Sequence, residues 1–242
     1  MSADATQAEV IELTVGVREK NKAEKLLRIR RAARLLFTKH GYDDTTMREI
    51  AKRAGVGFGT MFTYASNKRD LLFLIFNDDL DDVVDSALER ASRKRVFLEQ
   101  LIAYFSVFYA FFLPQPELSR VVLREMTFYL KGRQAEQFQA SCGQIVRHLA
   151  SLVEAAVSQQ TLAAREDPQV IAQALLSTFA QELRRWIAMD GPKLSSGLTR
   201  LRRMLVLQIS GLQPRRGALE SGALNVAGQL LKGAPEERRL RR

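Results

Sequence analysis

Residues 45–72 read TTMREIAKRAGVGFGTMFTYASNKRDLL, and this stretch decides the fold. Thr46 and, three residues later, Glu49 have the spacing of a capping box, which predicts that a helix starts at Thr46. Apolar residues then repeat at helical spacing as far as Gly55, which supplies a turn before a second helix over about 57–65. This order is that of a helix-turn-helix, which places its second helix in the major groove of DNA.

Long amphipathic helical patterns also fill the rest of the chain, separated by short segments that contain Gly or Pro, and no stretch alternates as a strand does. We therefore predict an all-α fold of about nine helices. Ser66 is the expected N-cap of the fourth helix. The predicted helices cover about 21–40, 46–54, 57–65, 67–91, 95–113, 116–132, 134–159, 168–190 and 196–212.

Four parts are predicted along the chain: a disordered segment 1–20, a DNA-binding domain 21–66, a helical regulatory and dimerisation domain 67–212, and a disordered basic tail 213–242. The formal net charge of +10 is unevenly distributed among them. Counting Lys and Arg against Asp and Glu gives +8 for residues 17–70, +1 for residues 71–212 and +4 for the tail. This distribution favours a polyanionic partner for the first domain. The tail either adds non-specific DNA affinity or is simply solvated.

Several classes of protein and site are not supported by the sequence. There is no run of 18 apolar residues, no signal-peptide pattern at the N-terminus, and one cysteine, Cys142, so we expect a cytoplasmic protein without a membrane span. His40 and His148 are isolated, and the acidic run 78–85 is interpreted as a solvated helix face, so no metal site is predicted. The glycines in 55–59 lack the spacing of a nucleotide-binding loop. We expect no cofactor and no enzymatic activity.

The second helix of the motif must bury one face and present the other to DNA. Val56, Met61 and Ala65 are the inward candidates. Phe58 and Phe62 are four residues apart and share a face, where they can contact thymine methyl groups, although either one can instead belong to the core. The outward set for base contact is Gly57, Phe58, Gly59, Phe62 and Thr63.

Phosphate contacts are expected around this helix. The hydroxyl groups of Thr60, Thr63 and Tyr64 would lie near the edge of the groove, and Lys68 lies in the first turn of the next helix, where an anion is favoured. Arg48 can reach a phosphate or a base edge, or remain a solvated surface residue. Thr45 and Thr46 can cap a helix and also contact a phosphate.

The stretch from Arg30 to Leu72 resembles the TetR family of bacterial transcriptional repressors, although tyrosine is usual at the position of Phe62 and phenylalanine is frequent at that of Ala65. The resemblance implies base and phosphate contacts from the second helix of the motif, phosphate contacts at Thr46, Tyr64 and Lys68, and a homodimer formed by the last two helices. It is carried by Ala32-Ala33, Leu36-Phe37, Gly41-Tyr42, Thr45-Thr46, Ile50-Ala51, Ala54-Gly55-Val56, Gly59-Thr60, Phe62, Tyr64, Asn67-Lys68 and Leu71-Leu72.

A dimer that reads two half-sites needs a rigid connection between its subunits, and apolar stripes in the last two helices are candidates for it, although they also suit an ordinary core. The predicted interface consists of Leu176, Phe179, Leu183, Trp186, Leu201 and Leu205.

Seven of the 19 aromatic residues lie in 97–112, which favours either a packed core or a small-molecule pocket. Members of the resembled family usually bind a ligand in this region and then release DNA. We therefore predict an apolar or aromatic effector that contacts Tyr104, Phe108, Phe128 and Tyr129 in a cavity between the fifth, sixth and seventh helices.

The sequence thus predicts a ligand-responsive repressor that binds a palindromic operator in double-stranded DNA as a homodimer. Two alternatives remain open. One is a helical small-molecule-binding or enzymatic protein whose helix-turn-helix is vestigial, and the other is a transcriptional activator.

Overall fold

The computed structural model describes residues 3–163 and 166–211, and every regular element in these residues is an α-helix, which confirms the predicted all-α class. The chain divides into one compact unit that ends at Leu205 and a second that starts at Val206, and the description below concerns the first. The predicted tail 213–242 lies outside the described residues. The helices are α1 (Ala3–His40), α2 (Met47–Ala54), α3 (Phe58–Tyr64), α4 (Lys68–Ser92), α5 (Phe97–Phe112), α6 (Pro116–Glu125), α7 (Ala135–Ser158), α8 (Pro168–Ile187) and α9 (Leu194–Ser210).

Helix α1 is longer than the sequence predicted. It begins at Ala3 rather than near Asn21, so most of segment 1–20, expected to be disordered, is helical in the structure. These residues include three Ala and three Glu, which favour helix, and no proline that would stop a helix already formed over residues 21–40.

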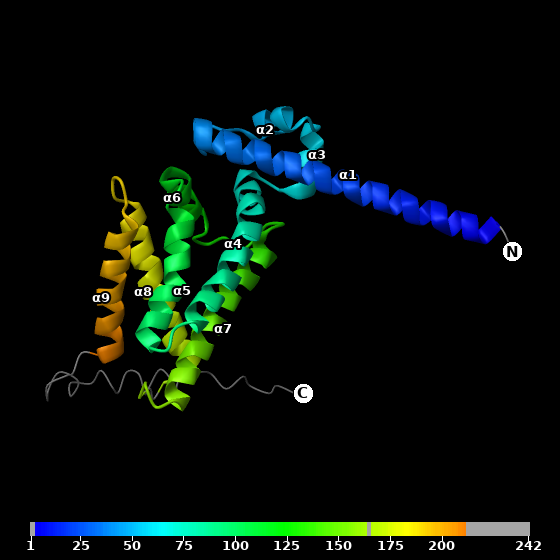
Figure 1. Ribbon diagram of the computed structural model, residues 1–242. Coiled ribbons are helices and arrows are strands. Elements are labelled where there is room, and N and C mark those ends of the chain that lie inside the picture. Colours follow the sequence, from blue (N-terminus) through cyan, green and yellow to red (C-terminus); the bar gives the residue numbers. More distant parts are fainter. Residues whose placement is uncertain (1–2, 164–165, 212–242) are drawn as a thin grey trace, which may run out of the picture. The chain divides into compact units, whose positions relative to one another are not determined.

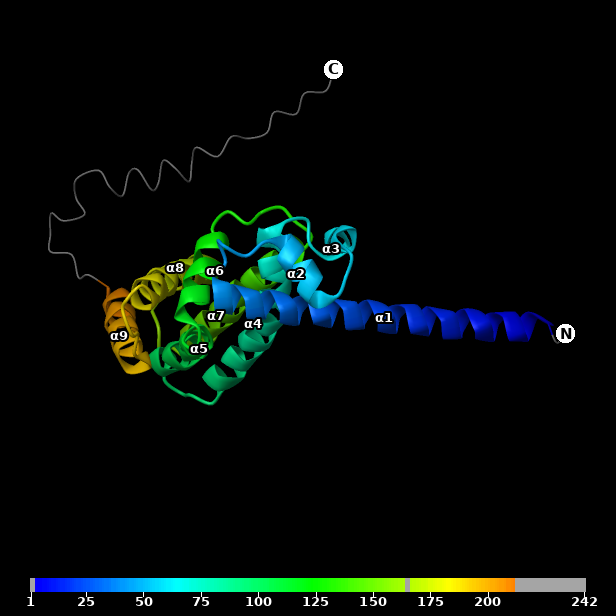
Figure 2. The ribbon, with the colours of Figure 1, turned by 90° about the horizontal axis from the view of Figure 1, so that it is seen from above.

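Helices α1, α2 and α3 pack on one another beside the start of α4 (Figure 1). Their shared core consists of side chains that are almost completely buried: Ile29, Ala33, Phe37, Ile50 and Met61. Helix α1 also contacts α4 and α6, and a view from above shows it passing over both (Figure 2). The helix that supports the helix-turn-helix is therefore also in contact with the helices that follow.

Helix α4 is the central element of the remaining fold and packs against both α5 and α7, while α7 packs against α8. Its run LLFLIF, residues 71–76, is buried all round, as expected for a helix that is covered on several sides. The aromatic residues of α5 fill the space between α4, α7 and α8, and Phe105 stacks on Phe179 with ring centroids 4.3 Å apart.

The start of α4 and the end of α6 also differ from the prediction, and each has a visible cause. The N-cap of α4 is Asn67 rather than Ser66, because the Asn67 side-chain oxygen accepts from the Asp70 N–H at 2.8 Å. Helix α6 ends at Glu125 rather than near Gly132. The Arg69 side chain donates to the carbonyls of Glu125 and Thr127, so the chain after α6 is held against α4 instead of continuing as a helix.

Candidate functional site

Helix α2 starts and stops as its sequence predicts. The Thr46 hydroxyl accepts from the Glu49 N–H at 3.2 Å, and the Glu49 carboxylate accepts from the Thr46 N–H at 2.7 Å, which completes the capping box. Gly55 ends the helix with a left-handed backbone, φ 64°, which glycine adopts without steric cost. The turn therefore fixes the direction in which α3 leaves α2.

Helix α3 has one buried and one exposed face. Met61 and Ala65 are completely buried, as predicted, and Val56 is half-buried. Phe58 and Phe62 are 40% and 42% exposed, and their rings meet edge to face with centroids 5.2 Å apart. Neither phenylalanine belongs to the core, so the expectation that both face outward is confirmed.

A positive charge lies beside these rings. The Arg48 side chain is exposed on α2, and its guanidinium carbon lies 5.3 Å from the centre of the Phe58 ring. No side-chain or distant backbone atom lies within 4 Å of the place that a Cβ on Gly59 would occupy, so this part of α3 allows close approach. Gly57 and Thr63 are exposed on the same short helix, and Thr60 is half-buried. The result is a small apolar surface with a cation at its edge.

Two of the predicted phosphate-contacting residues have partners inside the protein. Thr45 is buried, and its hydroxyl donates to the carbonyl of Gly41 at 2.7 Å, so it does not lie on the exposed face. The Lys68 ammonium donates to the carbonyls of Tyr42 and Asp43 at 2.9 and 3.0 Å and lies over the Tyr42 ring. Lys68 thereby fixes the loop between α1 and α2 to the start of α4.

Tyr64 is half-buried at the end of α3. Its hydroxyl donates to the carbonyl of Lys22 on α1 at 3.3 Å. The hydroxyl can still accept a bond, but its position depends on α1. Thr46 remains exposed at the start of α2, although its hydroxyl already serves the capping box.

A buried polar cluster that the sequence did not predict lies directly behind α3. Asp70 is completely buried, and its carboxylate accepts from the N–H groups of Ser66, Arg133 and Gln134 and from the Tyr129 hydroxyl. Burial by itself would raise the pKa of Asp70, but these four donors together hold it below its usual value. The cluster attaches the segment between α6 and α7 to the start of α4.

The aromatic residues predicted to contact an effector do not surround a cavity. Tyr104, Phe108 and Tyr129 are buried in the core, where Tyr129 stacks on Phe73 with centroids 3.9 Å apart. Phe128, by contrast, is 83% exposed and has a positive φ of 60°. Most of the aromatic residues that suggested an effector site therefore belong to the core of the helical domain.

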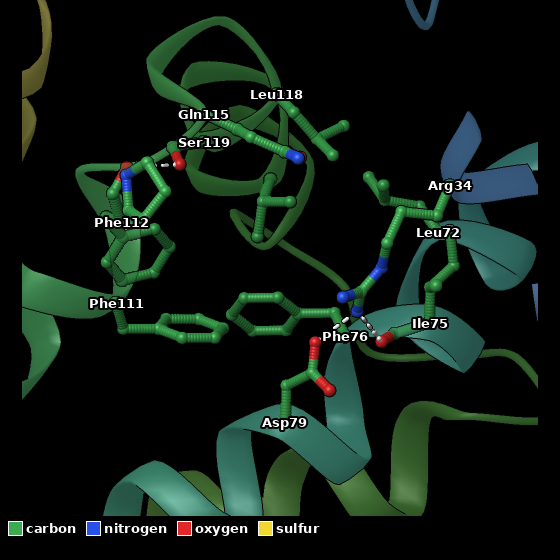
Figure 3. A pocket seen from close by; sticks show the side chains of 12 residues that line it. Arg34, Leu72, Ile75, Phe76, Asp79, Phe111, Phe112, Gln115, Leu118 and Ser119 are labelled. Atoms are coloured by element: carbon green, nitrogen blue, oxygen red, sulfur yellow. Dashed lines mark hydrogen bonds and ion pairs between the residues drawn. The ribbon is translucent and has the colours of Figure 1, made fainter. Parts of the chain in front are cut away.

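A pocket that is lined mostly by apolar residues lies between α1, α4, α6 and the end of α5 (Figure 3). Its volume is about 270 Å³, slightly below the usual range for small-molecule sites, which starts at roughly 300 Å³. One ion pair, Arg34 with Asp79, borders an otherwise mostly apolar wall. The lining residues are Arg34, Leu72, Ile75, Phe76, Asp79, Phe111, Phe112, Pro114, Gln115, Leu118, Ser119 and Val122.

The stripes predicted as a dimer interface are part of the core of a single chain. Phe179, Leu183, Trp186, Leu201 and Leu205 are buried without any partner chain, and only Leu176 is half-buried. Helical periodicity identified the apolar faces of α8 and α9 correctly but could not distinguish a core face from a face between subunits.

Within residues 3–163 and 166–211, no group of three or more His, Cys, Asp or Glu side chains could hold a metal ion. No single helix in these ranges is long and apolar enough to cross a membrane. Helices α5 and α6 reach the required length and composition only as a pair that is bent by 112°.

Two family models match the chain, one over the helix-turn-helix and one over the helices that follow it. The model for bacterial regulatory proteins of the tetR family matches residues 29–75, and the model for the tetracyclin repressor-like C-terminal domain matches residues 77–209. The chain belongs to the TetR family. The two matches meet inside α4, so this TetR-family chain contains the helix-turn-helix and the helical domain that are paired in the family.

Individual relatives are more distant. The fatty acid metabolism regulator protein of Bacillus subtilis is 28% identical over 107 residues, which cover 44% of this TetR-family chain and about half, 55%, of that relative. FadR of Thermus thermophilus, a TetR-family repressor solved with lauroyl-CoA, has a TM-score of 0.60 and 22% identity over 79% of this chain and 98% of its own. AibR, solved with isovaleryl coenzyme A and operator DNA, has a TM-score of 0.53 and 23% identity over 77% and 97%.

Proposed function

We propose that this chain is a transcriptional repressor that binds an inverted-repeat operator as a homodimer and leaves it when a small acyl-containing effector binds. The observation that carries the proposal is the exposed face of α3, where Phe58 and Phe62 lie beside Arg48 on a helix-turn-helix with a complete capping box. Solvent-exposed phenylalanines on a short helix are unfavourable in water, and contact with thymine methyl groups would remove that cost.

The proposed DNA-binding surface is narrower than the sequence suggested. Base contacts are assigned to Phe58, Phe62 and Thr63, with Gly57 and Gly59 allowing close approach. Phosphate contacts are assigned to Arg48 and Thr60. The hydroxyls of Thr46 and Tyr64 are assigned phosphate contacts as well, for which each must exchange its present acceptor, the Glu49 carboxylate or the Lys22 carbonyl, for a phosphate oxygen. Lys68 is assigned a positioning role, because its ammonium donates to two carbonyls of the loop before α2.

The effector site of the proposal is the pocket between α1, α4, α5 and α6. Its mostly apolar lining suits a hydrocarbon chain, and the relatives FadR and AibR are solved with acyl-coenzyme A molecules. The volume of about 270 Å³ suits a short or medium acyl chain better than a long one. A ligand that binds more tightly to a form with low DNA affinity must lower DNA affinity by the same coupling free energy.

The homodimer is part of the proposal because an inverted repeat requires two DNA-binding units. An interface on α8 and α9 would have to use exposed residues rather than the buried stripes. Ala174, Gln181 and Arg185 of α8 and Thr199 and Arg203 of α9 are exposed and available. Sedimentation velocity of the full chain, alone and with DNA, tests the stoichiometry.

The function is tested by selecting bound sequences from random DNA with the purified full chain. An inverted repeat among the enriched sequences supports the proposal, and the recovered operator can then be titrated with acyl-coenzyme A of different chain lengths. If a folded protein enriches no sequence, the proposal fails. A repressor of this kind acts on the bacterial chromosome, so the proposal includes a cytoplasmic location and no enzymatic activity.

A further inference from the structure

We propose that Arg34 makes the pocket selective for an apolar chain that carries a negatively charged group, and that binding of this group transfers the Arg34 guanidinium from α4 to the ligand. This inference rests on the proposed function, because it assigns a ligand class and a switching contact to the same pocket. The charged group can come from a free fatty carboxylate or from the phosphates of an acyl-coenzyme A.

The pocket has an apolar interior and a charged edge. Phe76 and Phe111 lie across its floor, and Leu118 closes it from α6 (Figure 3). Arg34 points into this space from α1, and it is the only Lys or Arg side chain in the pocket lining. A hydrocarbon chain that fills the floor would therefore bring a charged end group to one cation.

The present partners of Arg34 can be exchanged at low cost. Its Nη2 donates to the Asp79 carboxylate and, at 3.2 Å, to the carbonyl of Ile75. The Arg34 and Asp79 side chains are 49% and 39% exposed, and ion pairs at such solvent-exposed positions contribute little to stability. Both bonds leave from Nη2, so the other guanidinium N–H groups remain available for a bidentate contact with a carboxylate or phosphate.

Transfer of the Arg34 guanidinium to a ligand would also change the contacts between α1 and α4. Arg34 and Arg30 are one turn apart on α1, and they pair with the neighbouring residues Asp79 and Asp78 of α4. These are the two ion pairs between α1 and α4 in the part of the chain that the structure describes. Because α1 packs against α2, a ligand that takes Arg34 from Asp79 removes one of the two charged contacts between α4 and the helix that supports the helix-turn-helix. One side chain, Arg34, would thus contact the ligand and also connect α4 to α1, the helix that supports the helix-turn-helix.

Matched ligands and matched variants test this assignment. The full chain is titrated calorimetrically with decanoate, decanoyl-coenzyme A and 1-decanol, which share a chain length and differ in charge. Arg34→Gln removes the charge from the pocket. Arg30→Gln is the control, because it removes the neighbouring α1–α4 ion pair but does not line the pocket.

Arg34→Gln should weaken binding of at least one anionic ligand by about tenfold or more and leave 1-decanol within about twofold, since only the anionic ligands lose a hydrogen bond between two charged groups. A loss for decanoate alone identifies a carboxylate, and a loss for decanoyl-coenzyme A alone identifies its phosphates. Arg30→Gln should leave all three affinities unchanged. Asp79→Asn should strengthen anion binding, because the carboxylate that competes for Arg34 is gone.

Two results would overturn the assignment in different ways. If the wild type binds the ligands but Arg34→Gln weakens all three equally or none, the role of Arg34 is wrong and the effector pocket stands. If the wild type binds none of them, the effector pocket of the proposed function fails as well. Circular dichroism of each variant separates these results from unfolding, and the opposite effect expected for Asp79→Asn provides an independent check.

Discussion

The side-chain amide of Gln134 donates a hydrogen bond to the backbone carbonyl of Tyr64, 3.0 Å away, and so joins the residue before α7 to the last residue of α3. The backbone N–H of Gln134 donates to Asp70 at 3.0 Å, and its carbonyl accepts from the Asn77 side chain at 2.9 Å. One residue thus contacts α3 and two turns of α4. A displacement of the segment between α6 and α7 reaches α3 through a direct bond, which is a physical basis for coupling.

Asp70→Asn should destabilise the protein by about 2–3 kcal/mol at pH 7, because the amide cannot accept all four bonds and leaves buried donors unpaired. The native pKa of Asp70 lies below its usual value, so the contribution of the carboxylate is complete above the pKa of the unfolded chain, about 3.9. It disappears as the pH falls towards the lower native pKa. Urea unfolding should therefore show a difference between wild type and variant that is smaller at about pH 3 than at pH 7. A constant difference would contradict the assignment.

Gly132→Ala should destabilise the same cluster. A Cβ at this position would lie 2.6 Å from Asp70 Oδ1 and 2.7 Å from the Tyr129 hydroxyl oxygen, and the φ of 149° is unfavourable for other residues. We expect a loss of about 2–4 kcal/mol in the free energy of unfolding, measured by chemical denaturation. The neighbouring exposed residue provides the control, and Lys131→Ala should change stability by less than about 0.5 kcal/mol.

Phe62→Ala and Met61→Ala should have opposite consequences although the residues are adjacent. Phe62 is largely exposed, so its removal should change stability by less than about 1 kcal/mol but alter base preference by about 1–3 kcal/mol at one operator position. Met61 is completely buried, and its truncation should cost about 2–5 kcal/mol of stability. Thermal unfolding and a repeated DNA selection measure the two effects. An unchanged base preference for Phe62→Ala would remove Phe62 from the DNA contacts.

Lys68→Ala should act on stability rather than on phosphate binding. Its ammonium donates to the carbonyls of Tyr42 and Asp43, and losing these bonds should cost about 1–2 kcal/mol. The dependence of DNA affinity on salt should keep its slope. Arg48→Ala is the contrasting variant, because Arg48 is exposed and a lost phosphate contact should reduce the slope by about one. If Lys68→Ala reduces the slope and leaves stability intact, the two roles are reversed.

Local rules were sufficient for the helix-turn-helix. The capping box of Thr46 and Glu49 and the turn at Gly55 depend on residues within a few positions of each other, and the structure confirms all three. The outward direction of Phe58 and Phe62 followed from helical spacing in the same way. The partners of Lys68 could not be predicted, because its hydrogen bonds depend on how α4 meets the loop before α2. The bond from Thr45 to Gly41 is local, but the burial of Thr45 depends on how this loop packs.

Local sequence patterns could not predict the pocket between α1, α4, α5 and α6. Phe111 and Phe112 of α5 line the proposed pocket, but other aromatic residues of this helix pack on one another and on α8, as the stacking of Phe105 on Phe179 illustrates. The pocket proposed as the effector site combines α1 with α4, α5 and α6, and α1 is distant in sequence from the other three. One signal was present: Arg30 and Arg34 share a helix face, and Asp78 and Asp79 offer two adjacent carboxylates. Only the fold shows that these four residues meet.

The position of Arg34 on α1 also affects the construction of hybrids from two regulators of this kind. Hybrid sensors are naturally assembled by joining the first three helices of one protein to the remaining helices of another, with the boundary near residue 66. Such a graft would replace part of the pocket wall, since Arg34 precedes the boundary. If this pocket binds the effector, as proposed, the inducer response of the hybrid would change although every residue after the junction is retained, and position 34 would have to be transplanted together with the sensing helices.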